Sequence, residues 1–144
     1  MLDFAMAKLT LRIDFETAGA LGPGKIRLLE HVRDTGSISA AGRAMDMSYR
    51  RAWMLIDTLN TAFRQPVVTT KLGGKAGGGA VLTAFGEELV KNYRDMELVA
   101  HAALRPHLVM LEAAIGPARR GAAIIRPAVT PPRRLKSAGA RPRS

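Results

Sequence analysis

The chain of 144 residues is 47% hydrophobic and 24% charged, which is typical of one soluble domain with an appendage and excludes two large domains. It contains no cysteine, which excludes disulfides, thiolate metal sites and cysteine nucleophiles. It also contains no run of eighteen apolar residues, which excludes a transmembrane helix. Together these features predict a cytoplasmic protein with no membrane partner. Its net charge of +10 and pI near 11.1 favour a polyanionic partner, most often nucleic acid.

The N-terminal third predicts a strand followed by a helix. Every second residue is apolar over residues 8–15, the pattern of a strand with one buried face. The stretch TAGALGPG then reads as a loop. Pro23 suits the first turn of a helix, which we expect over about residues 23–35 with Gly36 as its left-handed C-terminal cap.

Two further helices follow closely. Ser37 can cap a short helix of sequence ISAAGRAM, whose small side chains let another helix cross it at short distance. Ser48 can cap a third helix, expected from Tyr49 to about Arg64 and stopped by Pro66. The apolar stripe expected on this third helix consists of Ala52, Ile56, Leu59 and Phe63.

A glycine-rich hairpin comes next. Two β-branched runs, VVTTKL and AVLT, flank the segment GGKAGGG and predict two strands joined by a long tip. A phosphate-binding P-loop is excluded, because Thr69 stands where a glycine is required and Ala76 follows Lys75 in place of serine or threonine. The tip is either a wing that approaches DNA or simply a flexible loop.

A long helix is expected over residues 84–115, with Thr83 as its cap and Pro106 kinking or ending it. Its apolar stripe is longer than one small core can cover, so a partner helix and therefore a homodimer are expected. The interface residues expected on this stripe are Phe85, Leu89, Tyr93, Met96 and Ala100.

Most of the net charge lies in the last 29 residues. Residues 116–144 hold eight basic residues, five prolines and no acid, whereas residues 1–115 hold fourteen basic and twelve acidic residues and carry a net charge of only +2. This composition predicts a disordered tail. The tail could assist DNA binding, bind RNA or aid solubility.

The order of elements predicts a winged helix-turn-helix, in which the second helix of the pair enters the DNA major groove. The first turns of that helix place Ser48, Tyr49, Arg50 and Arg51 as DNA-binding candidates, although two adjacent arginines can also be a solvated helix face. The wing adds Lys71, Gly74, Lys75 and Gly77. Trp53 lies one turn from Tyr49 and could stack with it on nucleic acid, but its main interpretation is packing against the first helix or the wing. The three histidines share no metal-ligand spacing, and the sequence contains no motif that arranges catalytic residues. We therefore expect the protein to bind neither a metal nor a cofactor and to have no enzymatic activity.

The segments GSISAAGRAMDMSYRRAW (36–53) and LGGKAGGGAVLTAFGEELVKNY (72–93) resemble the N-terminal DNA-binding domain of the molybdate-responsive ModE family of bacterial regulators. The resemblance implies a winged helix-turn-helix that dimerises through its long helix, with the N-terminal strand completing the wing sheet. It also implies that Ser37 and Ser39 face DNA phosphates. Full-length members carry C-terminal molybdate-binding domains, whereas a 29-residue tail is too short for one, so the chain resembles a stand-alone member that is not expected to bind molybdate.

The sequence therefore predicts a mainly α protein with a small β-sheet (α+β). The expected division is a DNA-binding domain at 1–83, a helical dimerisation segment at 84–115 and a basic tail at 116–144. The expected function is that of a dimeric, sequence-specific transcriptional regulator of double-stranded DNA. The alternative is a non-specific nucleoid or RNA-binding protein whose tail does most of the binding.

Overall fold

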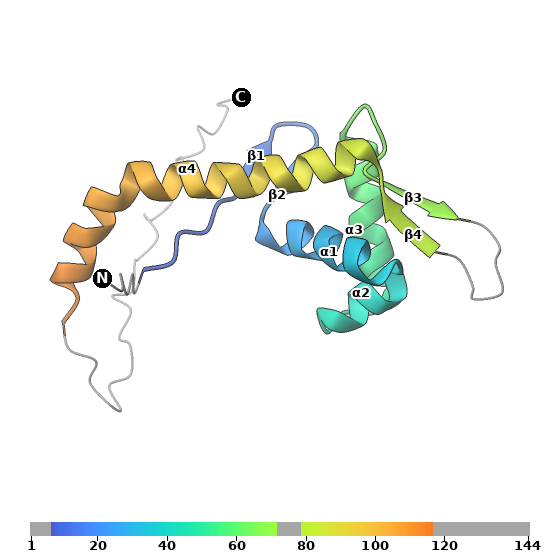
Figure 1. Ribbon diagram of the computed structural model, residues 1–144, viewed down its shortest axis with the longest axis horizontal. Helices are drawn as coiled ribbons and strands as arrows, with labels where there is room; N and C mark the ends of the chain where they lie inside the picture. Colours follow the sequence, from blue (N-terminus) through green and yellow to red (C-terminus); the bar gives the residue numbers. More distant parts are fainter. Residues whose placement is uncertain (1–6, 72–78, 117–144) are drawn as a thin grey trace, which may run out of the picture. The chain divides into compact units, whose positions relative to one another are not determined.

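The computed structural model describes residues 7–71 and 79–116. Four helices and two separate two-stranded sheets follow one another in this part of the chain (Figure 1). In chain order they are β1 (Ile13–Phe15), β2 (Gly19–Leu21), α1 (Pro23–Thr35), α2 (Ile38–Ala44), α3 (Tyr49–Ala62), β3 (Val68–Lys71), β4 (Gly79–Leu82) and α4 (Ala84–Ala114). The predicted fold class, a helix-turn-helix with a wing and a long helix, is confirmed.

The N-terminal strand differs from its prediction. Only Ile13–Phe15 of the expected strand forms a ladder, and its antiparallel partner is Gly19–Leu21, which the sequence predicted as loop. It does not complete the wing sheet, which consists of β3 and β4 alone. A local hairpin closes a much shorter loop than pairing with the wing would, and Gly19 supplies the positive φ of 80° in the turn region.

The helix pair is held by short-range chemistry that the sequence predicted. Gly36 ends α1 in the left-handed conformation with φ 67°, and the hydroxyl of Ser37 caps α2 by accepting from the Ala40 N–H at 3.1 Å. A Cβ on Gly42 would lie 3.1 Å from the Cβ of Ala52. The two helices can therefore approach this closely because both contact positions carry small residues.

Helix α3 ends at Ala62, two residues before the predicted end, because the backbone becomes extended at Phe63. Asn60 then joins the helix to the wing. Its Oδ1 accepts hydrogen bonds from the Val67 N–H at 2.7 Å and from the Val68 N–H at 3.1 Å, and its Nδ2 donates to the Val68 carbonyl at 3.0 Å. One side chain thus fixes where the wing leaves the helix pair.

The wing is fixed on its other side as well. The N–H of Ala80 in β4 donates to the Gly36 carbonyl at 2.9 Å, and the Thr83 hydroxyl donates to the Pro66 carbonyl at 2.6 Å. Thr83 also caps α4 by accepting from the Gly86 N–H at 2.9 Å, as predicted. The base of the wing is therefore bonded both to the turn between α1 and α2 and to the segment that follows α3.

The first turns of α4 complete the protein's own core. Leu89, Val90 and Tyr93 are buried with side chains of α1 and α3, and Phe85 packs edge-to-face on Phe63 with centroids 5.4 Å apart. Of the interface residues predicted from the sequence, Leu89 is 9% and Tyr93 1% exposed within a single chain. These two side chains therefore contribute to the core of the chain itself.

Beyond Tyr93 the same helix leaves the core. Its exposed fraction rises to 71% at Leu98 and 69% at Val99. Pro106 lies inside the helix and does not end it. The ribbon changes direction in its orange, C-terminal part, as the predicted kink requires (Figure 1).

Candidate nucleic-acid interface

The first turn of α3 is exposed and positively charged. The Ser48 hydroxyl caps the helix by accepting from the Arg51 N–H at 3.2 Å, which leaves its own proton free to donate. Tyr49 is 58% exposed, and Arg50 and Arg51 are both exposed. Within the described residues neither arginine forms an ion pair, so both guanidinium groups are available to a ligand.

Two hollows flank this turn on different sides of α3. One is lined by Ser48, Arg50, Arg51, Met54, Leu55 and Thr58, so the arginines share a surface with apolar side chains further along the helix. The other lies between α2, α3 and the base of the wing. Its lining residues are Ser37, Ile38, Ser39, Tyr49, Trp53, Thr70, Lys71, Gly79 and Ala80; we call it the wing groove.

The wing groove brings together several residues predicted separately from the sequence. Ser37 caps α2, Ser39 lies in its first turn, Tyr49 comes from α3 and Lys71 from the end of β3. All four line the same surface. Lys71 is exposed. The remaining predicted wing residues, Gly74, Lys75 and Gly77, lie outside the described residues.

Trp53, for which the sequence left open packing against the first helix or the wing and stacking on nucleic acid, is 47% exposed and lines the wing groove. Sequence reasoning missed one contributor to this surface. Arg43 is exposed and donates from Nη1 to the Ser39 Oγ at 3.1 Å, which adds a positive charge beside α2. The i,i+4 spacing of Ser39 and Arg43 could have indicated this pair.

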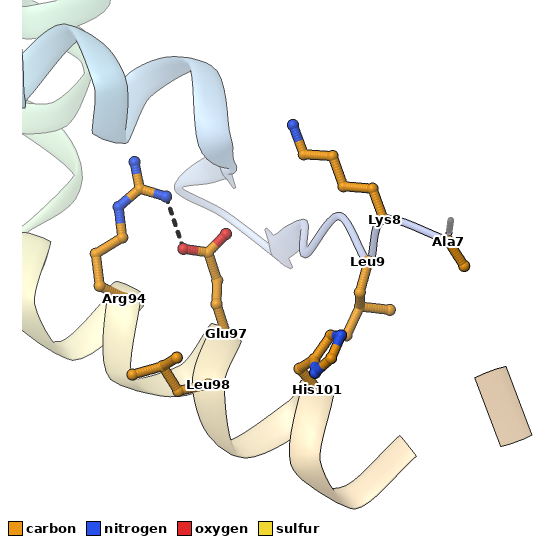
Figure 2. A pocket seen from close by; sticks show the side chains of 7 residues that line it. All are labelled: Ala7, Lys8, Leu9, Arg94, Glu97, Leu98 and His101. Carbon is orange, nitrogen blue, oxygen red and sulfur yellow. Dashed lines mark hydrogen bonds and ion pairs between the residues drawn. The ribbon is translucent and has the colours of Figure 1, made fainter. Parts of the chain in front are cut away.

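A hollow of about 520 Å³ lies elsewhere, between the N-terminal segment and α4. Figure 2 shows Arg94 paired with Glu97, and His101 and Leu9 also line this hollow. Arg94 also holds Glu30 of α1 through two of its nitrogens, and hydrogen bonds to Glu30 and then Glu97 raise the pKa of Arg94. This arginine is therefore occupied in joining α1 to α4 and is not free to bind an anion.

The N-terminal segment is held in the same region by α4. The Tyr93 hydroxyl donates to the Leu11 carbonyl at 2.7 Å, and burial, together with the Glu97 carboxylate, raises the pKa of Tyr93. Ala7 donates its N–H to Glu112 Oε1 at 3.0 Å. These contacts are structural, and they place no nucleophile beside a base.

Two other classes of site were searched for in the described part of the chain. No group of three histidine, cysteine or carboxylate side chains there lies close enough together to hold a metal ion. No helix in residues 7–71 or 79–116 has the length and apolar character needed to cross a membrane.

Known proteins share this region. Residues 24–87 match the family described as "Bacterial regulatory helix-turn-helix protein, lysR family". Molybdenum transport protein ModE of Azotobacter vinelandii is 39% identical over 94 residues, which cover 65% of this chain and 35% of that protein. Molybdenum-pterin-binding protein MopB of Rhodobacter capsulatus is 46% identical over 81 residues, covering 56% of this chain and 30% of that protein.

The DNA-binding transcriptional dual regulator ModE of Escherichia coli (strain K12) is 36% identical over 87 residues, covering 60% of this chain and 33% of the regulator. The chain therefore spans about a third of the length of the curated relatives that it matches. The matched range, residues 24–87, contains α1 from its second residue, α2, α3, both wing strands and the start of α4.

Proposed function

Because the chain carries a winged helix-turn-helix domain of the ModE type, we propose that it is a sequence-specific DNA-binding transcriptional regulator that acts as a homodimer. The observation that carries this proposal is the presence of exposed cations on α3, α2 and the base of the wing, around two hollows that flank the first turn of α3. These cations are Arg43, Arg50, Arg51 and Lys71. Duplex DNA is the polyanion whose major groove accepts a helix.

In the proposed complex α3 enters the major groove with its first turn foremost. Arg50 and Arg51 donate to guanine edges or to phosphates, and Ser48 and Tyr49 contact the adjoining backbone. Ser37, Ser39 and Lys71 hold phosphates on the side of the wing. Gly74, Lys75 and Gly77 extend this contact in the proposal. The mechanism is non-covalent and requires neither a catalytic residue nor a cofactor.

The proposed dimer uses the part of α4 that leaves the core. Leu98 and Val99 are the most exposed of the large apolar side chains there, at 71% and 69%; Met96 and Ala100, retained from the sequence prediction, adjoin them. Exposed apolar side chains grouped on one helix are typical of an interaction surface. Leu98→Glu should weaken self-association, measured by analytical ultracentrifugation. The control is Asn92→Ala, an exposed substitution that should leave self-association unchanged.

Two-fold symmetry would place the two α3 helices about 34 Å apart, on successive major grooves of a palindromic site. Such a protein works in the cytoplasm, where its DNA is. We propose no enzymatic role. The rival function, non-specific binding of DNA or RNA, is motivated by the eight basic residues of segment 116–144.

The test begins with selection of preferred duplexes from a random DNA pool by the full chain. Affinity for the selected and for a scrambled duplex is then measured by fluorescence anisotropy at several salt concentrations. Arg50→Ala or Arg51→Ala should reduce the preference for the selected duplex, because an arginine on a guanine edge discriminates by about 1–3 kcal/mol. Lys71→Ala should weaken both duplexes equally and reduce the salt slope by about one.

Arg12→Ala is the matched control, because Arg12 is exposed and paired with Asp14 at 2.9 Å in the N-terminal hairpin. It should leave affinity and preference unchanged. Selection that yields no preferred sequence, with equal affinity for all duplexes, would favour the non-specific rival. Full preference retained by both arginine variants would remove α3 as the reading element.

A further inference from the structure

The single tryptophan of the chain is exposed in the wing groove. Trp53 is 47% exposed, and Tyr49, one turn before it on α3, is 58% exposed. The aromatic ring pairs found in the described residues join phenylalanines, and within these residues the indole N–H of Trp53 has no hydrogen-bond partner. A tryptophan normally buries most of its surface and pairs its N–H, so this one is placed where a ligand can do both.

The lining of the wing groove fits one kind of ligand. Hydroxyl groups come from Ser37, Ser39 and Thr70, and Lys71 supplies a positive charge. No carboxylate is among the lining residues. The groove therefore combines an apolar aromatic wall with donors for an anion, and a sugar-phosphate backbone has the same alternation of an apolar ring and a charged group.

The position of the groove on α3 selects duplex DNA over a free strand. Arg50 and Arg51 line a different hollow, together with Met54, whereas Tyr49 and Trp53 line the wing groove. A helix in the major groove directs one side to base edges while its flank meets the backbone that borders the groove. The arginine side of α3 then corresponds to the bases, and the aromatic side to the backbone.

We infer that the wing groove holds one strand of the operator's sugar-phosphate backbone, with a deoxyribose against the indole of Trp53 and the adjoining phosphate within reach of the indole N–H and Lys71. This inference rests on the proposed function and deepens it. Trp53 then contacts the DNA backbone and helps to position α3 in the major groove, while Arg50 and Arg51 contact the bases.

The chain's single tryptophan makes the test direct, because its intrinsic fluorescence reports this residue alone. The probe is the selected duplex, added to the full chain while anisotropy of a labelled copy follows binding. Quenching of Trp53 by acrylamide should fall as the complex forms, along the same titration curve. A scrambled duplex bound at low salt provides the comparison.

Substitutions then separate the ring from its N–H. Trp53→Ala should weaken operator binding about tenfold, the scale of losing an aromatic contact to a nucleotide. Trp53→Phe keeps a ring but loses the donor, so a loss of about fivefold is expected. Thr61→Ala, an exposed change at the far end of α3, should leave affinity unchanged. Circular dichroism of each variant checks that the fold is intact.

The contacted phosphate can be located with duplexes that carry one neutral methylphosphonate at a time. At the predicted position, Trp53→Phe and the neutral phosphate should show losses that do not add, because both remove the same contact. Additive losses at every position would overturn the assignment of the N–H to a phosphate.

The outcomes separate this inference from the proposed function. If the duplex binds, with its preference dependent on Arg50, while Trp53 stays as accessible to acrylamide as in the free protein, the inference is wrong and the regulator proposal stands. Protection of Trp53 by a single-stranded oligonucleotide and not by the duplex would overturn the duplex assignment. Absence of any preferred duplex would remove the proposed function itself.

Discussion

Replacing Asn60 by alanine is expected to lower the free energy of unfolding by about 2–3 kcal/mol. The side chain makes three hydrogen bonds to the backbone of Val67 and Val68, at 2.7, 3.1 and 3.0 Å. Each bond of this kind contributes about 0.5–1.5 kcal/mol net. Asn60 is only partly buried, and water replaces some of the lost bonding, so the sum falls below the upper limit.

A loss of that size in a domain of about a hundred residues lowers the melting temperature by about 8–20 °C. The measurement is thermal unfolding followed by circular dichroism at 222 nm. Asn60→Asp should also lower the melting temperature, because the carboxylate keeps the acceptor for the Val67 and Val68 N–H groups but places its second oxygen against the Val68 carbonyl oxygen. The control is Asn92→Ala, an exposed asparagine on α4, which should melt like the unmodified chain.

Melting of Asn60→Ala within two or three degrees of the unmodified chain, which corresponds to well under 1 kcal/mol, would refute this reasoning. It would mean that the wing is attached to α3 by other contacts. A variant that melts early and also loses preference among duplexes would link the attachment of the wing to DNA reading.

Three further outcomes are expected. Gly86→Ala should cost about 3 kcal/mol or prevent folding, because its Cβ would lie 2.2 Å from the Val67 carbonyl oxygen, whereas Gly24→Ala, which has nothing within 4 Å, should melt at or above the unmodified temperature. Deletion of residues 117–144 should leave the helical signal and melting unchanged and make the salt dependence of DNA binding shallower, as seen in anisotropy titrations. Sodium molybdate is not expected to bind the 144-residue chain and should therefore leave its melting temperature unchanged. A ligand that binds only the native state must raise the melting temperature, so a clear shift at millimolar molybdate would contradict the sequence prediction.

The helix boundaries were predictable because cap chemistry is local. Gly36, Ser37, Ser48 and Thr83 all act in the positions predicted for them. Each depends on backbone groups two to four residues away, and such distances are fixed once the helix forms. The crossing of α2 and α3 followed equally well from small residues such as Gly42.

The partner of the N-terminal strand was not predictable in the same way. The alternation of apolar and polar residues over residues 8–15 predicted a strand with one apolar face. It did not indicate which segment would pair with that strand. Trp53 shows the same limit at the candidate site. Its spacing places it on a helix face, but whether that face is covered depends on where β3 and β4 lie, and their position is fixed by Asn60 and Gly36 through contacts distant in the sequence.

Helix α4 shows why periodicity alone cannot locate the end of the core. Its apolar stripe continues at the same spacing past Tyr93, so the pattern gives no sign of where the core ends. That end is set by tertiary contacts. Thr83 and Gly86 fix the start of the helix against Val67 and Pro66, and Arg94 makes the last described polar contact with α1, through Glu30.

The apolar residues Leu89, Val90 and Tyr93 before this ion pair are buried within the chain itself, whereas Leu98 and Val99 beyond it are exposed. In the proposed dimer, a second copy docks on the part of α4 beyond Arg94. The proposal thus gives the helix two separate roles. Its first turns stabilise the domain that would present α3 to DNA, and its exposed remainder would set the distance between two such domains.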